Sequence, residues 1–307
     1  MRASLIIIDG GGSSTDVAAF DGTREIGRST FPSCKPNAES MQTDELCRHL
    51  GTWLVTTRCA ITETTFILIG MSGIWSVEER RSYLLDFDMS WSHYVGDLLP
   101  RTSVISDVEL VQLAALQSGS GIVLIAGTGS IALSVDTVGI QRRCGGWGPR
   151  IDDSGSGFWI GREALRAVAR MLDGRGPSTL LIRPVAAFLV VDPNDVILLQ
   201  NKLRATSIDR CARLAQAVLS YAEEGDVIAV DIRLRAADHL AALVLAVRAT
   251  IPTVEPNLIL YGSLWQNESL RSMVISLVAT VHPDTSCSML ADVCASAARA
   301  LTPEELA

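Results

Sequence analysis

Two aspartates stand where a short apolar run gives way to a turn or a helix. Asp9 follows the run Leu5–Ile8 and precedes three glycines, and Asp107 follows Ser103–Ser106 and opens a helical stretch. A carboxylate at a glycine turn is suited to hold Mg²⁺ through water, because magnesium keeps much of its hydration shell. A carboxylate at a helix start is suited to act as a general base in phosphoryl transfer. Each also has an ordinary structural explanation, as a turn residue or a helix N-cap.

Two glycine-rich turns each follow a run that is typical of a buried strand. The first lies in the stretch 9–16 and the second in 126–130. Glycines let the backbone approach an anion closely, and successive N–H groups form a phosphate-binding concavity. Two such turns, one of them opening with an acid, predict a pair of loops that hold a nucleotide polyphosphate.

A third glycine-rich loop, 144–157, is too long for a plain turn and leads into a helix near Phe158. It places Asp153 and a set of free backbone amides beside a helix N-terminus, which is a natural site for polar ligands. Trp147 in this loop is suited either to stack on a sugar face or to anchor the loop by packing.

Composition narrows the class of protein. The 307 residues suffice for two lobes, and 48% hydrophobic content supports packed cores. The net charge of −8 argues against a nucleic-acid partner. Seven cysteines without a CxxC pair favour a reducing compartment over a disulfide framework or a zinc site. With no secretory leader or bilayer-spanning run evident, we expect a cytoplasmic protein with no membrane partner.

The elements that must position these residues repeat in each half. Three strands are predicted at 4–9, 15–21 and 25–31, and again at 122–126, 131–135 and 139–143. Helices are predicted at 40–59, 78–86, 108–117 and 158–172, through most of 177–250, and at 289–301, with single strands at 65–70, 103–106 and 257–261. The Ser118–Gly121 stretch is the expected hinge, which gives lobes of residues 1–118 and 119–307, with the last helix packing back on the first lobe.

The order of these motifs resembles that of N-acetylglucosamine kinases in the BadF/BadG/BcrA/BcrD group of the sugar-kinase, chaperone and actin superfamily. The resemblance covers nearly the whole chain, and its most specific part runs from Gly145–Gly148 to Trp159–Glu163. It implies an α/β fold of two ribonuclease-H-like (actin-like) lobes with ATP in the cleft between them.

The resemblance also implies a role for each matching residue. Asp107 would be the base for the sugar 6-hydroxyl, and Asp9 would hold Mg²⁺. The phosphates of ATP would bind Gly11, Gly12, Ser13, Gly127, Thr128 and Gly129, and the adenosine would lie near Gly262 and Ser263. The sugar pocket would be lined by Asn37, Ser72, Gly73, Gly146, Trp147 and Asp153.

Three departures from the family pattern bear on the substrate. The loop that usually supplies an Asn reads Ser33-Cys34-Lys35-Pro36-Asn37, so either Asn37 keeps that role or Lys35 replaces it. The usual Gly-Asp-Glu-Gly-Ser loop is replaced at 152–156 by Asp-Asp-Ser-Gly-Ser. The Gly-Ala pair expected near the last helix is replaced by Ala291-Asp292.

We therefore expect an ATP-dependent hexosamine kinase that phosphorylates the 6-hydroxyl of N-acetylglucosamine or glucosamine. The expected partner is a small amino sugar, and the resemblance makes a homodimer plausible. A lysine at position 35 would favour an acidic sugar such as N-acetylmuramic acid, unless its side chain only faces solvent. The sequence also leaves open a non-catalytic sugar or ATP sensor and an activating ATPase of a dehydratase.

Overall fold

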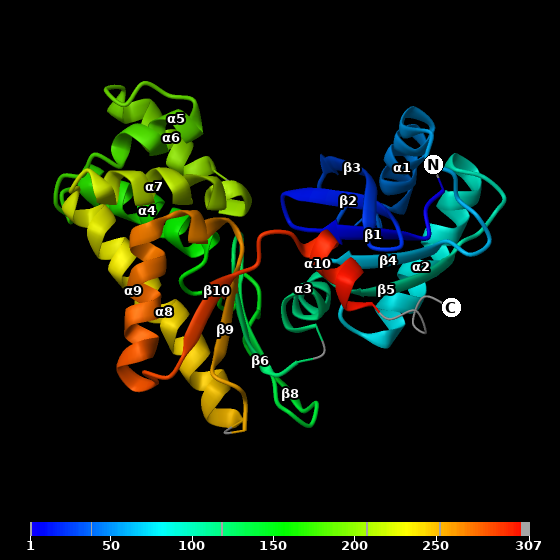
Figure 1. Cartoon of the computed structure of the whole chain (residues 1–307). Helices are drawn as coiled ribbons and strands as arrows, with labels where there is room; N and C mark the ends of the chain where they lie inside the picture. The colour runs from blue at the N-terminus through cyan, green and yellow to red at the C-terminus, as the bar shows by residue number, and fades with distance from the viewer. Residues whose placement is uncertain (1, 38, 118, 207, 252, 302–307) are drawn as a thin grey trace. The chain divides into compact units, whose positions relative to one another are not determined.

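The computed structural model describes residues 2–37, 39–117, 119–206, 208–251 and 253–301 (Figure 1). The chain divides into two compact units. Unit 1 comprises Met1–Ser118 together with Leu290–Ala307, and unit 2 comprises Gly119–Met289. Ser118, the first residue of the expected hinge, lies outside the described residues.

Unit 1 is built on a five-stranded sheet in the order β3-β2-β1-β4-β5. β1 pairs with β2 in antiparallel fashion and with β4 in parallel, and β4 pairs with β5 in parallel. β1 and β4 are buried at every residue, which is why both strands read as continuous apolar runs. The strands are β1 (Leu5–Gly10), β2 (Ser14–Asp21), β3 (Arg24–Pro32), β4 (Phe66–Met71) and β5 (Arg101–Ser106).

The helices of unit 1 pack as two pairs, α1 with α2 and α3 with α10. α10 also contacts β1 and β2, so the end of the chain belongs to this unit. The Cys294 thiol of α10 is buried within reach of the Ile7 carbonyl in β1. The helices are α1 (Thr43–Thr57), α2 (Val77–Tyr94), α3 (Asp107–Leu116) and α10 (Val293–Ala300).

Unit 2 repeats the strand order of unit 1. Its sheet runs β8-β7-β6-β9-β10, with β6 parallel to β9 and antiparallel to β7. The two sheets therefore share one topology, as the repeated strand and glycine-turn pattern predicts. The strands are β6 (Gly121–Ala126), β7 (Ser130–Val135), β8 (Gln141–Gly145), β9 (Asn257–Tyr261) and β10 (Ser286–Met289).

Most of unit 2 is helical, and its core joins the sheet to the long helix α8. Apolar residues of β6, β9, α4, α7 and α8 form one continuous buried cluster. The helical segments are α4 (Gly157–Leu172), α5 (Ile182–Leu189), α6 (Val196–Ala205), the 3-10 turn η1 (Ile208–Leu214), α7 (Ala215–Glu223), α8 (Val227–Thr250), η2 (Ser263–Gln266) and α9 (Glu268–Val281).

The α/β fold class with two lobes is confirmed, and the differences lie at edges and ends. α2 continues to Tyr94, eight residues beyond the predicted helix end at 86. The stretch at 286–289 forms β10, an edge strand whose Ser-Cys-Ser-Met sequence lacks the β-branched residues that indicate strands. The last helix consequently begins at Val293, with the Asp292 side chain accepting from the Ala295 amide.

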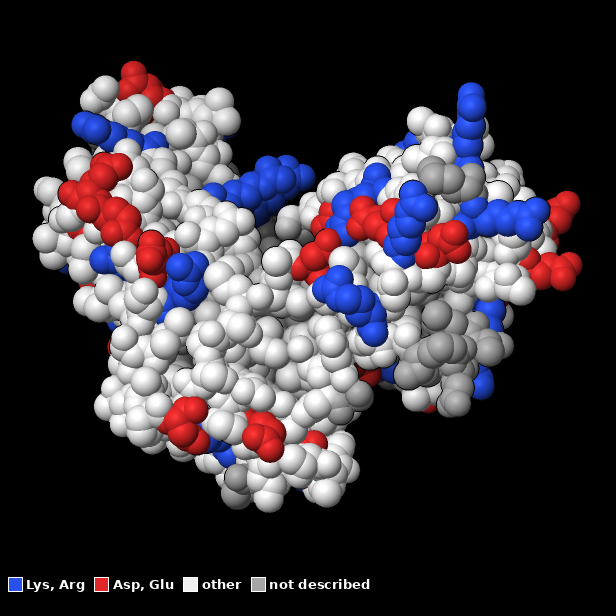
Figure 2. Space-filling view, viewed as in Figure 1, with Lys and Arg blue, Asp and Glu red and all other residues white. Residues whose placement is uncertain are grey.

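The surface carries charges of both signs. On the face in view, Lys and Arg side chains are interspersed with Asp and Glu and with wide uncharged areas (Figure 2). All seven cysteines are free thiols. Among the described residues, no helix combines the length and the apolar character that crossing a membrane requires.

Candidate functional site

One edge of the unit 1 sheet gathers three of the predicted site residues. Parallel pairing aligns Gly10 with Met71 and Met71 with Ser106, so β1, β4 and β5 end side by side. The Ser72 amide donates to the Gly10 carbonyl at 2.8 Å. Asp9, Ser72 and Asp107 thus lie at the carboxyl ends of parallel strands, where open α/β sheets bind their ligands.

Asp107 is the first helical residue of α3 and is half-buried. The Val108 amide donates to its Oδ1 at 2.9 Å, and the Ser72 hydroxyl donates to its carboxylate. Burial raises the pKa of Asp107 above its ordinary value, and hydrogen bonds from Val108, Ser72 and its own backbone, together with the charge of Lys35, offset only part of that rise. A carboxylate of raised pKa is a stronger base, which suits it to accept a proton from a hydroxyl.

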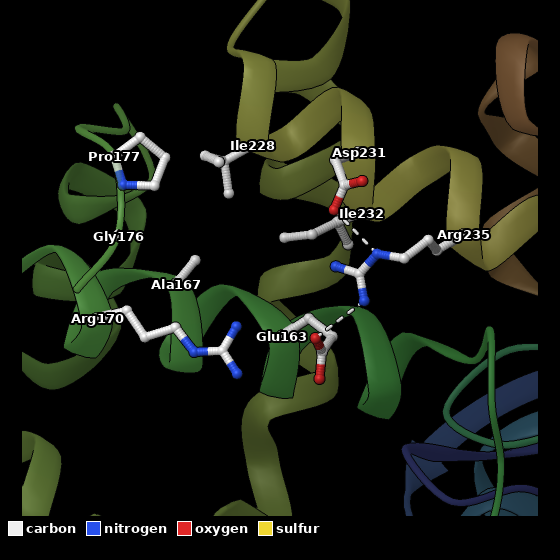
Figure 3. A pocket seen from close by; sticks show the side chains of 9 residues that line it. All are labelled: Glu163, Ala167, Arg170, Gly176, Pro177, Ile228, Asp231, Ile232 and Arg235. Carbon is white, nitrogen blue, oxygen red and sulfur yellow. Dashed lines mark hydrogen bonds and ion pairs between the residues drawn. The ribbon is translucent and has the colours of Figure 1, made fainter.

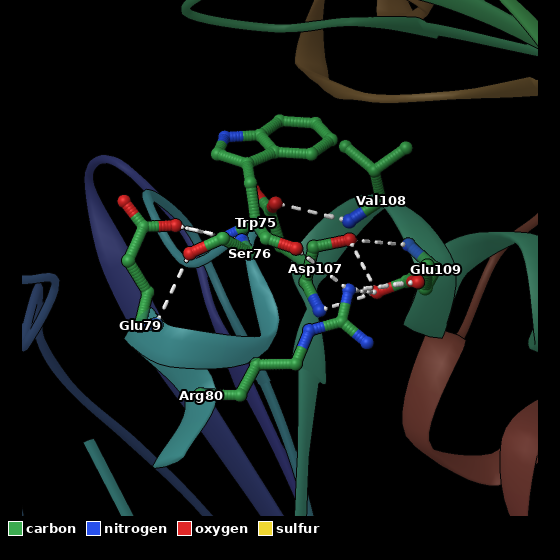
Figure 4. A network of polar contacts seen from close by, with 8 residues as sticks. Trp75, Ser76, Glu79, Arg80, Asp107, Val108 and Glu109 are labelled. Carbon is green, nitrogen blue, oxygen red and sulfur yellow. Dashed lines mark hydrogen bonds and ion pairs between the residues drawn. The ribbon is translucent and has the colours of Figure 1, made fainter. Parts of the chain in front are cut away.

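The N-terminus of α3 is held by a capping box that also reaches α2. Ser106 Oγ accepts from the Glu109 amide at 3.1 Å, and Glu109 Oε2 accepts from the Ser106 amide at 2.7 Å. Arg80 Nη2 donates to both Glu109 carboxylate oxygens at 2.8–2.9 Å and to the Trp75 carbonyl at 3.1 Å. Figure 4 shows the Arg80 guanidinium between the Trp75–Ser76 segment and Glu109. The loop after β4 and the helix that carries Asp107 are thereby joined.

The first glycine turn brings two carboxylates together. Asp9 pairs with Asp16 across β1 and β2, and Asp16 pairs with Thr30 across β2 and β3, so the three side chains share one face of the sheet. The Thr30 hydroxyl donates to Asp16, and Asp9 is 8% exposed. The described residues contain no cluster of three or more acidic, His or Cys ligands. Two neighbouring carboxylates nevertheless fit Mg²⁺, which is bound by one or two carboxylates, waters and substrate phosphates.

The tip of the same turn exposes Gly12 and Ser13, next to the half-buried Gly11. The Gly11 amide donates to the Ser14 carbonyl at 2.9 Å, and the Ser33 hydroxyl donates to the Gly11 carbonyl at 2.8 Å. The turn is therefore fastened to the segment that follows β3.

That segment carries Lys35 and Asn37. The Cys34 amide donates to the buried Thr15 hydroxyl at 3.0 Å, which fixes the backbone next to Lys35. The Asn37 side-chain oxygen accepts from the amides of Glu39 and Ser40 at 2.8 and 2.9 Å. Asn37 thus forms a local Asx turn that uses its side-chain oxygen.

The second glycine turn is bonded to the N-terminus of α4. The amides of Gly157 and Phe158 donate to the carbonyls of Gly127 and Thr128 at 2.8 and 3.1 Å, and Ser156 Oγ caps the Trp159 amide. The expectation of free amides at this helix start is wrong, because the turn and the cap use them. What the contacts provide instead is a fixed second turn, with Thr128 exposed at its tip.

Asp153 joins the third glycine loop to the second turn. Its carboxylate accepts from the Gly148 amide at 3.2 Å and from the Ser130 amide, and it packs against Gly129. Burial raises the pKa of Asp153 to about 6. Its φ of 95° is rare for a residue other than glycine, and such strain is concentrated at functional sites. Asp153 therefore organises the third glycine loop and joins it to the second turn.

The remaining predicted residues of unit 2 lie beside the second glycine turn or within the third glycine loop. Gly262 follows β9 with φ 118°, and a side chain there would overlap the backbone of Ala126, directly before the second turn. Ser263 is exposed. The Gly146 amide donates to the Ser130 carbonyl at 2.9 Å, and the Trp147 ring is 62% exposed with the Arg143 guanidinium 4.9 Å from its centre.

A charged cavity of about 90 Å³ lies between α4 and α8 (Figure 3). The Glu163 carboxylate, 10% exposed, pairs with Arg166 at 2.7 Å and Arg235 at 3.2 Å, and Arg235 pairs with Asp231 at 2.9 Å. Arg235 also lies 5.1 Å over the Trp159 ring. The ion pair between Glu163 and Arg235 therefore joins α4 to α8 beside the cavity.

The structure adds residues that the sequence interpretation missed. Asp16 joins Asp9 only through strand register, which no local motif indicates. The capping role of Glu109 could be predicted from the sequence, because Ser106-x-x-Glu109 before an apolar run is the signature of a capping box. The contact from Arg80 joins residues 29 positions apart, and no local pattern encodes it.

The sequence and the fold of this chain are similar to those of known sugar kinases and to one family model. The model of the BadF/BadG/BcrA/BcrD ATPase family matches residues 8–288. An N-acetylmuramic acid/N-acetylglucosamine kinase of Clostridium acetobutylicum is 29% identical over 79% of this chain and 78% of its own length. An N-acetyl-D-glucosamine kinase of Dictyostelium discoideum is 31% identical over 78% and 77%. A crystal structure from Chromobacterium violaceum, of a proposed N-acetylglucosamine kinase, superposes with a TM-score of 0.73 at 24% identity and covers 97% and 98% of the two chains.

Proposed function

Because the chain belongs to the BadF/BadG/BcrA/BcrD ATPase family, we propose that it is an ATP-dependent kinase that phosphorylates the 6-hydroxyl of N-acetylglucosamine or glucosamine. The names of both curated relatives include N-acetylglucosamine kinase activity. The observation that carries the proposal is Asp107, a half-buried carboxylate of raised pKa at the strand edge that also holds Asp9 and the first glycine turn.

In this proposal Asp107 acts on the acceptor hydroxyl. The carboxylate accepts the proton as the sugar oxygen bonds to the γ-phosphorus of ATP, and the bond from that phosphorus to the bridging oxygen breaks to release ADP. The Ser72 hydroxyl and Val108 amide hold the carboxylate in one orientation. A correctly placed base contributes about 10²–10⁴-fold to the rate.

The phosphates would bind the amides of the two glycine turns. Gly12 and Ser13 are exposed at the tip of the first turn, and Thr128 at the tip of the second. Asp9 and Asp16 would hold Mg²⁺, which when bound neutralises phosphate charge. Gly262 would border the adenosine, and its lack of a side chain lets the end of β9 pack directly against the Ala126 backbone before the second turn.

The test is ADP release with ATP and Mg²⁺ against glucosamine, N-acetylglucosamine, N-acetylmuramic acid, N-acetylmannosamine and glucose. Wild type and Asp107→Asn are compared, with folding checked by circular dichroism. We expect turnover that depends on an amino sugar and falls at least about 100-fold in the variant. ATP binding without turnover on any sugar would favour a sensor, and turnover without sugar in an iron-containing preparation would favour a dehydratase-activating ATPase.

A second candidate substrate is N-acetylmuramic acid, which one curated relative is named for. The specific observation is Lys35, whose charge acts on Asp107 and whose neighbour Cys34 is anchored to Thr15. Lys35 is exposed and its charge acts on the Asp107 carboxylate, so it would attract the lactyl carboxylate of that sugar and repel the ammonium of glucosamine. Lys35→Ala would then lower kcat/KM for N-acetylmuramic acid relative to N-acetylglucosamine. An unchanged ratio would remove this candidate.

A further inference from the structure

Trp75 is one of only two exposed tryptophans among the six in the chain. Its side chain is 41% exposed and that of Trp147 is 62% exposed, whereas the other four are at most 7% exposed. An indole left at the surface forgoes a large burial energy, so exposed tryptophans are the informative ones. Trp147 lies in the loop that the family resemblance assigns to the sugar. Trp75 has no role in the proposed reaction so far.

The loop that carries Trp75 lies against the base. Ser72, three residues earlier, donates to the Asp107 carboxylate, and the Ile74 amide donates to the Met71 carbonyl at 3.3 Å to turn the chain. The Trp75 carbonyl shares one Arg80 nitrogen with Glu109, whose carboxylate binds the Ser106 amide. A short chain of hydrogen bonds therefore links the Trp75 backbone to the residue before Asp107.

The backbone of Trp75 is fixed on both sides while its ring stays at the surface. Its amide donates to Glu79 Oε2 at 2.9 Å and its carbonyl accepts from Arg80 at 3.1 Å. In Figure 4 the indole extends away from the Glu79 and Arg80 side chains that hold its backbone. A ring on a held backbone can form a binding surface at low entropic cost, because little remains to be ordered on binding.

We propose that Trp75 is a substrate-binding residue that packs its indole on the apolar face of the acceptor sugar while Asp107 takes the hydroxyl proton. The inference rests on the proposed kinase function and deepens it by naming a specificity-determining contact. Pyranose rings present C–H groups on one face, and an aromatic ring offers a large, rigid surface to them. Trp75 thereby favours acceptors with an unobstructed C–H face over compact polar acceptors such as glycerol.

Kinetics with matched variants give the first test. Trp75→Ala should raise the KM for the amino sugar about tenfold and leave the KM for ATP within about twofold, because only the acceptor contact is lost. Trp75→Phe should restore most of the affinity. Tyr94→Ala is the control, since Tyr94 is an aromatic residue of the same unit with 38% exposure at the far end of α2. Equal changes in both KM values, or none in that for the sugar, would overturn the proposal.

A binding measurement separates this inference from the proposed function. Protein labelled with 5-fluorotryptophan is titrated with N-acetylglucosamine without nucleotide, and the resonance absent from Trp75→Phe is assigned to Trp75. We expect that ¹⁹F resonance to shift. A shift of the Trp147 resonance alone would refute the role of Trp75 and leave the kinase proposal standing. No shift together with no sugar-dependent turnover would refute both.

Discussion

Replacing Glu109 by Gln is expected to weaken the contacts that position Asp107 while leaving the Asp107 side chain itself unchanged. The Glu109 carboxylate accepts from the Ser106 amide and hydroxyl at 2.7 and 2.8 Å and from Arg80. Burial would raise the pKa of Glu109, but these hydrogen bonds and the Arg80 charge outweigh it and lower the pKa. Glu109 is therefore ionised at neutral pH, and the variant removes a charge that three donors share.

The size of the effect follows from those contacts. The capping contribution is about 1 kcal/mol, and an ion pair as exposed as this one adds about 0–1 kcal/mol. Glutamine keeps one acceptor oxygen, so we expect unit 1 to lose about 1–2 kcal/mol of unfolding free energy. Because Asp107 follows Ser106 directly, we also expect kcat to fall about tenfold, equivalent to about 1.4 kcal/mol of transition-state stabilisation.

The matched control is Glu79→Gln in α2. Ser76 and Glu79 form the same capping box at the same 3.1 and 2.7 Å, but no base stands at that helix start. Urea unfolding and steady-state kinetics on both variants separate stability from positioning. We expect both variants to be destabilised and only Glu109→Gln to lose kcat. Because Glu79 also accepts from the Trp75 amide, any kinetic effect of Glu79→Gln should fall on the KM for the sugar. Equal kcat values for the two variants would refute the view that the Arg80–Glu109 contact positions Asp107.

Three further predictions concern the other parts of the site. Burial raises the folded pKa of Asp153 to about 6, so the stabilising effect of its neutral form is lost as pH rises through that value. The unfolding free energy of Asp153→Asn, measured in urea, should therefore rise by about 1–3 kcal/mol relative to that of wild type between pH 4 and 7. A difference between the two proteins that does not change with pH would contradict the burial argument. Gly262→Ala should destabilise unit 2 by more than about 2 kcal/mol and raise the KM for ATP, because the new Cβ would overlap the Ala126 backbone. The control is Gly174→Ala, at a position that has φ 76° but open space around it. This variant should lose about 1 kcal/mol of unfolding free energy and leave the KM for ATP unchanged. Because its pKa is raised, Asp107 should place the acidic limb of the kcat/KM profile above about pH 4, and a limb at the ordinary Asp value would argue against it as the base.

Much of the fold could be predicted because strand and turn signals are local. Apolar runs such as Leu5–Ile8, closed by glycine, identified the opening strands of both sheets, and the repeated order indicated the shared topology. The edge strand β10 could not be predicted, since one partner strand and an exposed face leave little apolar signal in its sequence.

The candidate site was predictable in its residues and less so in its contacts. Asp9, Ser72 and Asp107 come together because three parallel strands end at one edge, and sequence order predicts that arrangement once the strands are known. The free amides expected at α4 are absent because Gly157 and Phe158 donate to the turn at Gly127 and Thr128, a contact between segments 30 residues apart.

The position of the new phosphate tests the central claim most directly. Wild-type protein is incubated with ATP, Mg²⁺ and N-acetylglucosamine or glucosamine, and the product is examined by ³¹P–¹H correlation NMR. The account predicts a sugar phosphate whose phosphorus couples to the two protons on C6, and no such product with Asp107→Asn. Coupling to the anomeric proton, or an equal yield from the variant, would contradict the assignment of Asp107 as the base for the 6-hydroxyl.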